Sequence, residues 1–227
     1  NHENDIQNEI QKDVDQFINI DETNDEDAIE KISRFNIDIL IDLSIIITNN
    51  RQKIISSRPA KKIISYLGYP GTSGYNFYDY IITDKIVTPE NKQSYYSEKF
   101  LYLPNTYQVS NGIKNIPMKD NLKSDYGLPN ESIVLSCFNQ SFKIDKIIFE
   151  SWMNILKKLS SAYLWILEDN EVAKENLTEC AKLYGISSDR LIFAPRIDRD
   201  RHLERLTLVD VALDTRIYNG HTTTTDA

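Results

Sequence analysis

The stretch that decides the fold runs from Ser132 to Leu167 and contains three blocks. The first block is the apolar run Ser132-Ile-Val-Leu-Ser-Cys-Phe138, and the last is Ala162-Tyr-Leu-Trp-Ile-Leu167. Between them, Asp145–Leu159 carries its apolar side chains on one helical face. A strand, a helix and a second strand in this order predict two parallel strands joined by a right-handed crossover.

The same alternation continues toward the C-terminus. The patterns there predict a helix, a strand, a short helix and a strand, at Glu171–Tyr184, Leu191–Ala194, Arg201–Leu206 and Val209–Asp214. Gly185 follows the first of these helices directly, and glycine is favoured at that position because it adopts a left-handed backbone without strain. We therefore predict a Rossmann-like α/β lobe over residues 131–227.

A second set of strands precedes this lobe. We predict them at Ile37–Leu43, Ile63–Leu67, Tyr80–Thr83 and Phe100–Leu103. The first reads as a buried parallel strand, and a helix capped by Asn24 precedes it. Residues 105–128 lack sustained periodicity, so we expect an incomplete first lobe at 1–108, a linker at 109–130 and an incomplete second lobe at 131–227.

Composition excludes several classes of protein. The chain has 227 residues and a formal net charge of −8, which disfavours broad binding to nucleic acids or anionic membranes. No apolar run approaches the roughly 20 residues of a membrane span. We expect no signal peptide, because the first residues, Asn1 to Gln11, are polar and acidic. Cys137 and Cys180 are the two cysteines, without a CxxC pair or a histidine at metal spacing. We expect no metal, no disulfide framework and a reducing, cytoplasmic location.

Three polar clusters follow predicted strands, where open α/β sheets bind ligands. The first is Cys137-Phe-Asn-Gln-Ser-Phe-Lys143. A lysine just beyond a strand end and before a helix is well placed to contact a phosphate. From position alone, a merely solvated loop lysine is the more common case.

The second cluster is Ala194-Pro-Arg-Ile-Asp-Arg-Asp-Arg-His202, which gathers three arginines and a histidine around a helix start. A flat cation or an imidazole there can stack on a base, and a helix N-terminus favours anions. A surface ion-pair cluster with Asp198, Asp200 and Glu204 explains the same residues equally well.

The third cluster is Asp214-Thr-Arg-Ile-Tyr-Asn-Gly-His-Thr-Thr-Thr-Thr-Asp226. Backbone N–H groups and hydroxyls after a glycine turn can surround a diphosphate at a helix start. Asp226, one turn inside that helix, is then in reach of ribose hydroxyls. The alternative is a threonine-rich helix cap, although a cap needs one hydroxyl and not four.

Taken in order, these segments resemble the catalytic domain of O-GlcNAc transferases and their bacterial relatives. The resemblance covers nearly the whole chain from Phe17 onward. Its first-lobe motifs are Arg58-Pro-Ala, Tyr66-Leu-Gly-Tyr-Pro-Gly-Thr-Ser-Gly74, Asp79-Tyr-Ile-Ile-Thr-Asp84, Tyr96-Ser-Glu-Lys99 and Leu103-Pro104. Its second-lobe motifs are Phe138-Asn-Gln-Ser-Phe-Lys-Ile144, Trp152-Met-Asn-Ile-Leu156, Leu213-Asp-Thr215 and Asn219-Gly-His-Thr-Thr223 with Asp226.

The resemblance implies a GT-B fold and an inverting, metal-independent transfer of GlcNAc or a related hexose from UDP to Ser or Thr hydroxyls of polypeptides. It implies that Gln140 and Lys143 meet the phosphates, with Lys143 stabilising the leaving group. His202 would stack on uracil and Arg199, where the family often has Lys, would lie at the uridine edge. The remaining implied contacts are the diphosphate with His221, Thr222 and Thr223, the ribose with Asp226, and the sugar with Leu67 and Gly68.

One departure concerns the segment after Asp42-Leu-Ser44, where the family usually has Gly, then His or Tyr, then Thr. Here the residues are Ile45, Ile46, Ile47 and Thr48. A non-catalytic UDP-sugar-binding module therefore remains an alternative, as does a transferase with another hexose donor or a non-protein acceptor.

The short linker between the lobes favours the bacterial type of O-GlcNAc transferase. The chain lacks an initial Met, and we expect it to be a catalytic-domain fragment that transfers no sugar alone.

Overall fold

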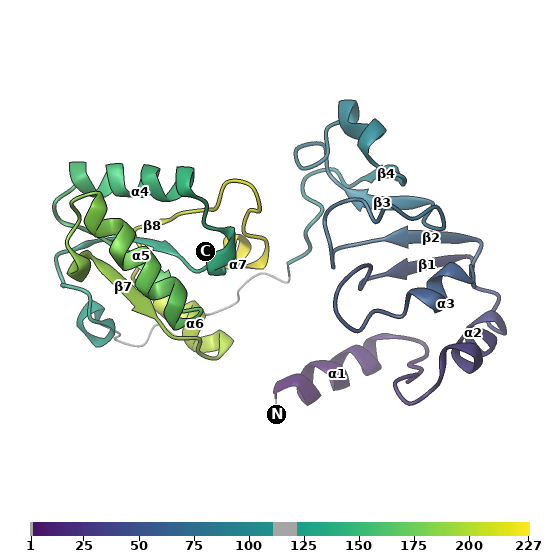
Figure 1. Cartoon of the computed structure of the whole chain (residues 1–227). Helices are drawn as coiled ribbons and strands as arrows, with labels where there is room; N and C mark the ends of the chain where they lie inside the picture. The colour runs from purple at the N-terminus through teal and green to yellow at the C-terminus, as the bar shows by residue number, and fades with distance from the viewer. Residues whose placement is uncertain (1, 111–121) are drawn as a thin grey trace. The chain divides into compact units, whose positions relative to one another are not determined.

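The computed structural model describes residues 2–110 and 122–227. The chain divides into two compact units, Asn1–Val109 and Ser110–Ala227, and Figure 1 labels most of their helices and strands. In the described part of each unit there is one four-stranded sheet, and all paired strands in both sheets are parallel. The prediction of an α/β chain with two Rossmann-like parts is confirmed. Within the described residues, no helix is long and apolar enough to cross a membrane.

The first unit has its strands in the order β1-β2-β3-β4. They are β1 (Ile39–Asp42), β2 (Lys62–Ser65), β3 (Tyr80–Thr83) and β4 (Lys99–Tyr102), each within two residues of its predicted position. The helices are α1 (His2–Asp13), α2 (Asp25–Ser33), α3 (Gln52–Ser56) and the 3-10 helix η1 (Glu90–Tyr95). Neither α1 nor α3 was among the predicted elements, because α1 is almost entirely polar and α3 spans five residues. A helix is predicted from apolar side chains that recur at helical spacing, and α1 has too few of them while α3 is too short to show the repeat.

Strand β1 is less buried than predicted. Ile39 and Ile41 are 55% and 49% exposed, whereas Leu40 packs against the core around Ile45 and Ile63. Successive side chains of a strand point to opposite faces, and β1 lies at the edge of its sheet. One face of the strand therefore contributes to the core and the other does not, so the prediction of a buried strand is wrong for that second face.

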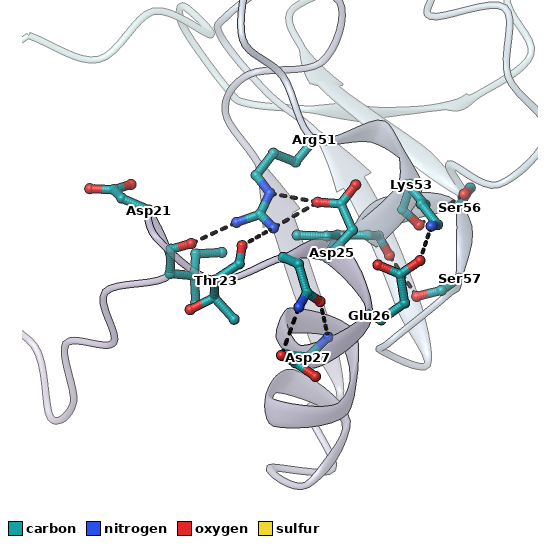
Figure 2. Close-up of polar contacts among 12 residues, drawn as sticks. Asp21, Thr23, Asp25, Glu26, Asp27, Arg51, Lys53, Ser56 and Ser57 are labelled. Carbon is teal, nitrogen blue, oxygen red and sulfur yellow. Dashed lines mark hydrogen bonds and ion pairs between the residues drawn. The ribbon is translucent and has the colours of Figure 1, made fainter.

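Arg51 fixes the segment before α2 to the start of α3 (Figure 2). Its Nε donates to Oδ1 of Asp25 at 2.8 Å, and its Nη atoms donate to the carbonyl oxygens of Ile20 and Thr23 at 2.7 and 2.6 Å. All three guanidinium nitrogens thus bond within the unit. An arginine with several hydrogen bonds of this kind holds backbone carbonyl groups and a carboxylate together. The Asp25 carboxylate therefore helps to hold the fold of the first unit.

The second unit has the strand order β7-β6-β5-β8. These strands are β5 (Ile133–Cys137), β6 (Ala162–Leu167), β7 (Leu191–Ala194) and β8 (Val211–Ala212). The helices are α4 (Lys146–Lys158), α5 (Glu171–Leu183), α6 (Arg199–Leu206) and α7 (Thr222–Asp226), with 3-10 helices η2 (Lys123–Tyr126), η3 (Ser141–Lys143) and η4 (Ser188–Arg190). Gly185 ends α5 with a φ of +73°, as predicted from its position.

Two apolar clusters cover the faces of this sheet. On one face, Trp152 and Leu156 of α4 pack with Ala181 of α5 against β5 and β6. On the other face, Trp165 of β6 packs with Leu128 and with side chains of η2 and α6. Of the predicted linker 109–130, residues 111–121 lie outside the described residues. Leu128 is 1% exposed, so the last part of that segment packs as a part of the second unit.

Candidate functional site

The strand order of the second unit reverses between β5 and β8. In an open parallel sheet, the loops leaving the carboxyl ends of two such strands separate to opposite faces and leave a ligand-binding crevice. The loop after β5 contains Asn139, Gln140 and Lys143, and the loop after β8 leads through Asp214 to α7. The first and third polar clusters predicted from the sequence thus meet at the switch point.

Asn139 joins the two loops. Its side chain is 5% exposed, and its Nδ2 donates to Oδ1 of Asp214 at 3.0 Å and to Oγ1 of Thr215 at 3.2 Å. Its Oδ1 accepts a hydrogen bond of 2.8 Å from Oγ1 of Thr223 in α7. A buried amide with this many partners resists reorientation, because any rotation leaves polar groups unpaired.

Asp214 shapes the loop before α7. Besides Asn139, its Oδ1 accepts from the backbone N–H of Thr215 at 2.7 Å and from that of Gly220 at 2.6 Å. At Gly220 a Cβ atom would lie 2.2 Å from Oγ1 of Thr224. A larger residue at this position would therefore force the side chains of the first turn of α7 to move. A cavity of about 40 Å³ lies in this region, and Asn139, Asp214, Thr223 and Thr224 are among the residues that line it.

Lys143 reaches this loop from η3. Its Nζ donates to the carbonyl oxygen of Asn219 at 3.1 Å and lies 4.1 Å from the centre of the Tyr218 ring. The side chain is half-buried. The structure therefore favours an organised lysine over the merely solvated one that position alone suggested.

Gln140 is exposed and begins η3, where its carbonyl oxygen accepts from the N–H of Lys143 at 3.0 Å. The next residue, Ser141, donates from its N–H and its hydroxyl to Oδ2 of Asp169 at 3.1 and 2.8 Å. Arg196 pairs with the other oxygen of the same carboxylate at 3.0 Å. Asp169 thereby ties the loop after β5 to the loop after β7.

The second cluster divides into ion pairs with different partners. Arg201 lies 3.7 Å from Asp198, its own helix cap, which fits the surface ion-pair alternative. Arg199 instead pairs with Asp226 of α7 at 2.7 Å. Two residues predicted at the uridine and the ribose are thus brought together by the fold.

His202 is held as a neutral donor. Its Nδ1 accepts from Nε of Arg205 at 3.0 Å, and its ring meets the ring of Phe138 edge to face at 5.1 Å. Because arginine only donates, the proton of a neutral His202 is on Nε2. Burial, reinforced by the Arg205 charge, lowers the pKa of His202. At neutral pH the ring is available to stack or donate without carrying charge.

His221 precedes α7 as its N-cap residue, and Thr222 and Thr223 form the first turn. Burial is the main cause that lowers the pKa of His221, and the Lys143 charge adds to it. The first N–H groups of a helix have no partner within that helix. Within the described residues, no group of three or more His, Cys, Asp or Glu side chains is arranged to hold a metal ion.

Leu67 and Gly68 belong to the first unit, and they form a tight turn after β2. The N–H of Gly68 donates to the carbonyl oxygen of Tyr66 at 2.8 Å, and Leu67 has a φ of +66°. A Cβ atom on Gly68 would lie 2.1 Å from the carbonyl oxygen of Leu43. This turn therefore packs directly on the end of β1 and needs glycine at that point.

Ile45, the first residue of the departure from the expected Gly-containing segment, lies beside this turn. It is fully buried and has a φ of +49°, a backbone conformation that favours glycine. Asp42 holds it there by accepting from the N–H groups of Ser44 and Ile45 at 2.9 and 3.1 Å. The backbone thus keeps a glycine-like conformation although a β-branched side chain fills the space.

Comparison with known proteins decides the family. The family model described as "Glycosyl transferase family 41" matches residues 1–123 and 114–227, which together span the chain. The chain belongs to glycosyl transferase family 41. The resemblance stated from the sequence is thereby confirmed.

The family 41 chain is similar to curated proteins over most of its length. It is 35% identical over 222 residues to the probable UDP-N-acetylglucosamine–peptide N-acetylglucosaminyltransferase SEC of Arabidopsis thaliana, covering 96% of this chain and 23% of that protein. It is 24% identical over 310 residues to the UDP-N-acetylglucosamine–peptide N-acetylglucosaminyltransferase of Caenorhabditis elegans, covering 88% of this chain and 27% of that protein. The chain therefore spans about a quarter of these relatives.

A solved structure gives the same result for the fold. A lysine-to-methionine mutant of the O-GlcNAc transferase of Thermobaculum terrenum superposes with a TM-score of 0.83 at 27% identity, covering 96% of this chain and 41% of that chain. The prediction of a GT-B-like α/β fold is confirmed by this match.

Several residues that shape the candidate site had no role assigned to them from the sequence. Asn139, Asp214, Asp169 and Arg205 each hold a predicted residue or its loop in position. Asn139 and Asp214 both follow strands, which was a usable signal. Nothing in the sequence distinguishes Asp169 or Arg205 from ordinary surface residues, because their partners lie on other elements.

Proposed function

We propose that this chain is the part of a catalytic domain that binds UDP during transfer of GlcNAc, or a related hexose, to Ser and Thr hydroxyls of polypeptides. The observation that carries the proposal is the loop from Asp214 to His221 at the switch point, which Asn139 joins to Thr223 of α7 and which has the Lys143 ammonium beside it. The names of the relatives, which are peptide N-acetylglucosaminyltransferases, support the donor and the acceptor.

The chemistry requires stabilisation of a departing anion. In an inverting transfer, the acceptor oxygen bonds to the anomeric carbon while the bond to UDP breaks and its electron pair leaves with the diphosphate. Lys143 and hydrogen-bond donors of His221, Thr222 and Thr223 would meet this developing charge, with Gln140 beside them. Donors fixed in advance contribute most where charge develops, and in this proposal they replace a divalent metal. The base that accepts the hydroxyl proton is not assigned to this chain.

The nucleoside is assigned to the α6 side of the unit. The neutral ring of His202 would stack on uracil, Arg199 would lie at the uridine edge and Asp226 would accept from ribose hydroxyls. The position of Asp226 beside Arg199 supports a shared site for these two residues. Leu67 and Gly68 of the first unit are proposed to contact the sugar.

Calorimetric titration of the chain with UDP and with GDP, each with and without EDTA, tests this proposal. We expect UDP to bind more tightly than GDP, and we expect EDTA to leave UDP binding unchanged. Tighter binding of GDP, no binding of UDP, or binding lost in EDTA would each contradict the proposal.

In a transfer assay with radiolabelled UDP-GlcNAc and a peptide library, we expect a complete domain containing this chain to label peptides and this chain alone to label none.

A non-catalytic UDP-sugar-binding module is the second candidate, and the buried Ile45 favours it. Such a module would bind UDP in the titration, but the complete domain would label no peptide. We also propose a cytoplasmic location and a bacterial-type catalytic domain, with a short connection between its lobes. The free thiols of Cys137 and Cys180 support the location, and the short segment between Val109 and Ile133 supports the bacterial type.

A further inference from the structure

The partners of the Lys143 ammonium are both uncharged. They are the carbonyl oxygen of Asn219, at 3.1 Å, and the face of the Tyr218 ring, whose centre lies 4.1 Å from Nζ. Across residues 2–110 and 122–227, no carboxylate pairs with Lys143. An ammonium whose partners are a dipole and a ring attracts an approaching anion, whereas a neighbouring carboxylate would offset that attraction.

The backbone that carries Tyr218 is fixed from inside the loop. Thr215 is 1% exposed, and its Oγ1 donates to the carbonyl oxygen of Tyr218 at 2.6 Å. The carbonyl oxygen of Thr215 accepts from the side chain of Asn219. The Tyr218 ring itself is 46% exposed, so this ring is held over Lys143 from the backbone and contributes little to the core.

We propose that Tyr218 is a positioning residue that holds the Lys143 ammonium, with its charge unneutralised, toward the diphosphate of the nucleotide. This inference rests on the proposed function, because it assigns Lys143 to the diphosphate. One of the three ammonium N–H groups is used by Asn219, which leaves others for phosphate oxygens. The ring orients the ammonium and does not itself touch the nucleotide.

The contact itself can be tested without a ligand. Lysines of the full 227-residue chain are reductively methylated with ¹³C, and the Lys143 signal is identified by its loss in Lys143→Met. We expect this signal to be shifted by the ring current of Tyr218, to keep its shift in Tyr218→Phe and to lose it in Tyr218→Leu. An unshifted Lys143 signal in the unsubstituted chain overturns the inference whatever the nucleotide does.

The functional part is tested by a double-mutant cycle in UDP affinity. A cation over an exposed aromatic ring corresponds to a change of about two- to fivefold in an equilibrium constant. We expect Tyr218→Leu to weaken UDP binding by about that factor, and Tyr218→Phe to leave it unchanged. In the Lys143→Met background, Tyr218→Leu should have no further effect, because the ring acts through the lysine.

Tyr95→Leu is the matched control. Tyr95 is 71% exposed in the first unit and carries Lys92 at 5.5 Å from its ring centre, so the same chemical change removes a similar contact elsewhere. We expect no change in UDP affinity. The inference is overturned if Tyr218→Leu weakens UDP binding equally in both backgrounds, or in neither. In that case, a strong loss of UDP affinity in Lys143→Met would still support the proposed function. If Lys143→Met leaves UDP affinity unchanged, both the inference and the assigned role of Lys143 are wrong.

Discussion

Arg199 and Asp226 form an ion pair in which an Nη atom of the arginine lies 2.7 Å from Oδ1 of the aspartate. The two residues are 27 positions apart and lie on α6 and α7. The Asp226 side chain is 10% exposed and that of Arg199 is 52% exposed. A carboxylate so covered, with one oxygen held by a cation, has a fixed orientation toward any ligand that approaches it.

The first prediction concerns Asp226. Asp226→Ala should weaken binding of free uridine by about tenfold or more, since a hydrogen bond to a charged group contributes about 1.5–3 kcal/mol. Uridine is the appropriate ligand because Arg199, once released, would add a favourable charge for phosphates. Calorimetry measures the change, and Asp200→Ala, an exposed carboxylate of the same helix as Arg199, is the control. Unchanged uridine affinity would remove Asp226 from the ribose site.

The second prediction concerns Lys143. In a complete catalytic domain containing this chain, Lys143→Ala should lower kcat roughly 100-fold, about 3 kcal/mol, because the charge acts mainly on the departing diphosphate. Affinity for UDP should fall less, by about tenfold. Steady-state kinetics provide the measurement, with a melting curve to verify the fold. Lys146→Ala, an exposed lysine three residues away, should behave as wild type. Near-normal turnover of Lys143→Ala would shift the leaving-group role toward His221.

The third prediction concerns Gly68. Its substitution by alanine would place a Cβ atom 2.1 Å from the backbone oxygen of Leu43, and backbone cannot yield as a side chain can. We expect Gly68→Ala to lower the free energy of unfolding by about 2–3 kcal/mol. Gly74→Ala is the control, because Gly74 has a φ of +72° but open space around it, and it should cost about 1 kcal/mol. Urea titration compares the two, and equal losses would refute the steric argument.

The fourth prediction concerns pH. Burial lowers the pKa of His202 below its ordinary value near 6.5, so protonation is disfavoured in the folded state. The stability that this residue contributes is complete above that ordinary value and is lost as the pH falls below it. We expect the melting temperature to drop between about pH 7 and pH 5. His202→Asn keeps an acceptor for Arg205 and cannot titrate, so its drop should be smaller. If the melting temperature of His202→Asn drops as much as that of the unsubstituted chain, the effect comes from other groups, such as His221.

Much of the fold was readable from local patterns. Strands such as Ala162–Leu167 and Leu191–Ala194 were predicted at the residues where they occur, because dense apolar runs bounded by turn formers have few other stable conformations. The exposed face of β1 was not readable. Ile39 and Ile41 are apolar in either case, and only the tertiary structure shows that their face of the strand is not covered.

The sequence by itself determined the alternation of strands and helices, the glycine at the end of α5 and the three polar clusters behind their strands. It also determined the family, because several motifs in a fixed order can be recognised from the amino-acid sequence alone. Only the tertiary structure decided which polar residues meet. The ring of Tyr218 over Lys143, Asn139 between Asp214 and Thr223, and Arg199 on Asp226 all join residues at least 27 positions apart. The physical reason is that hydrogen bonds and ion pairs act over a few ångströms, and parallel strands bring together loop residues that lie far apart in the sequence.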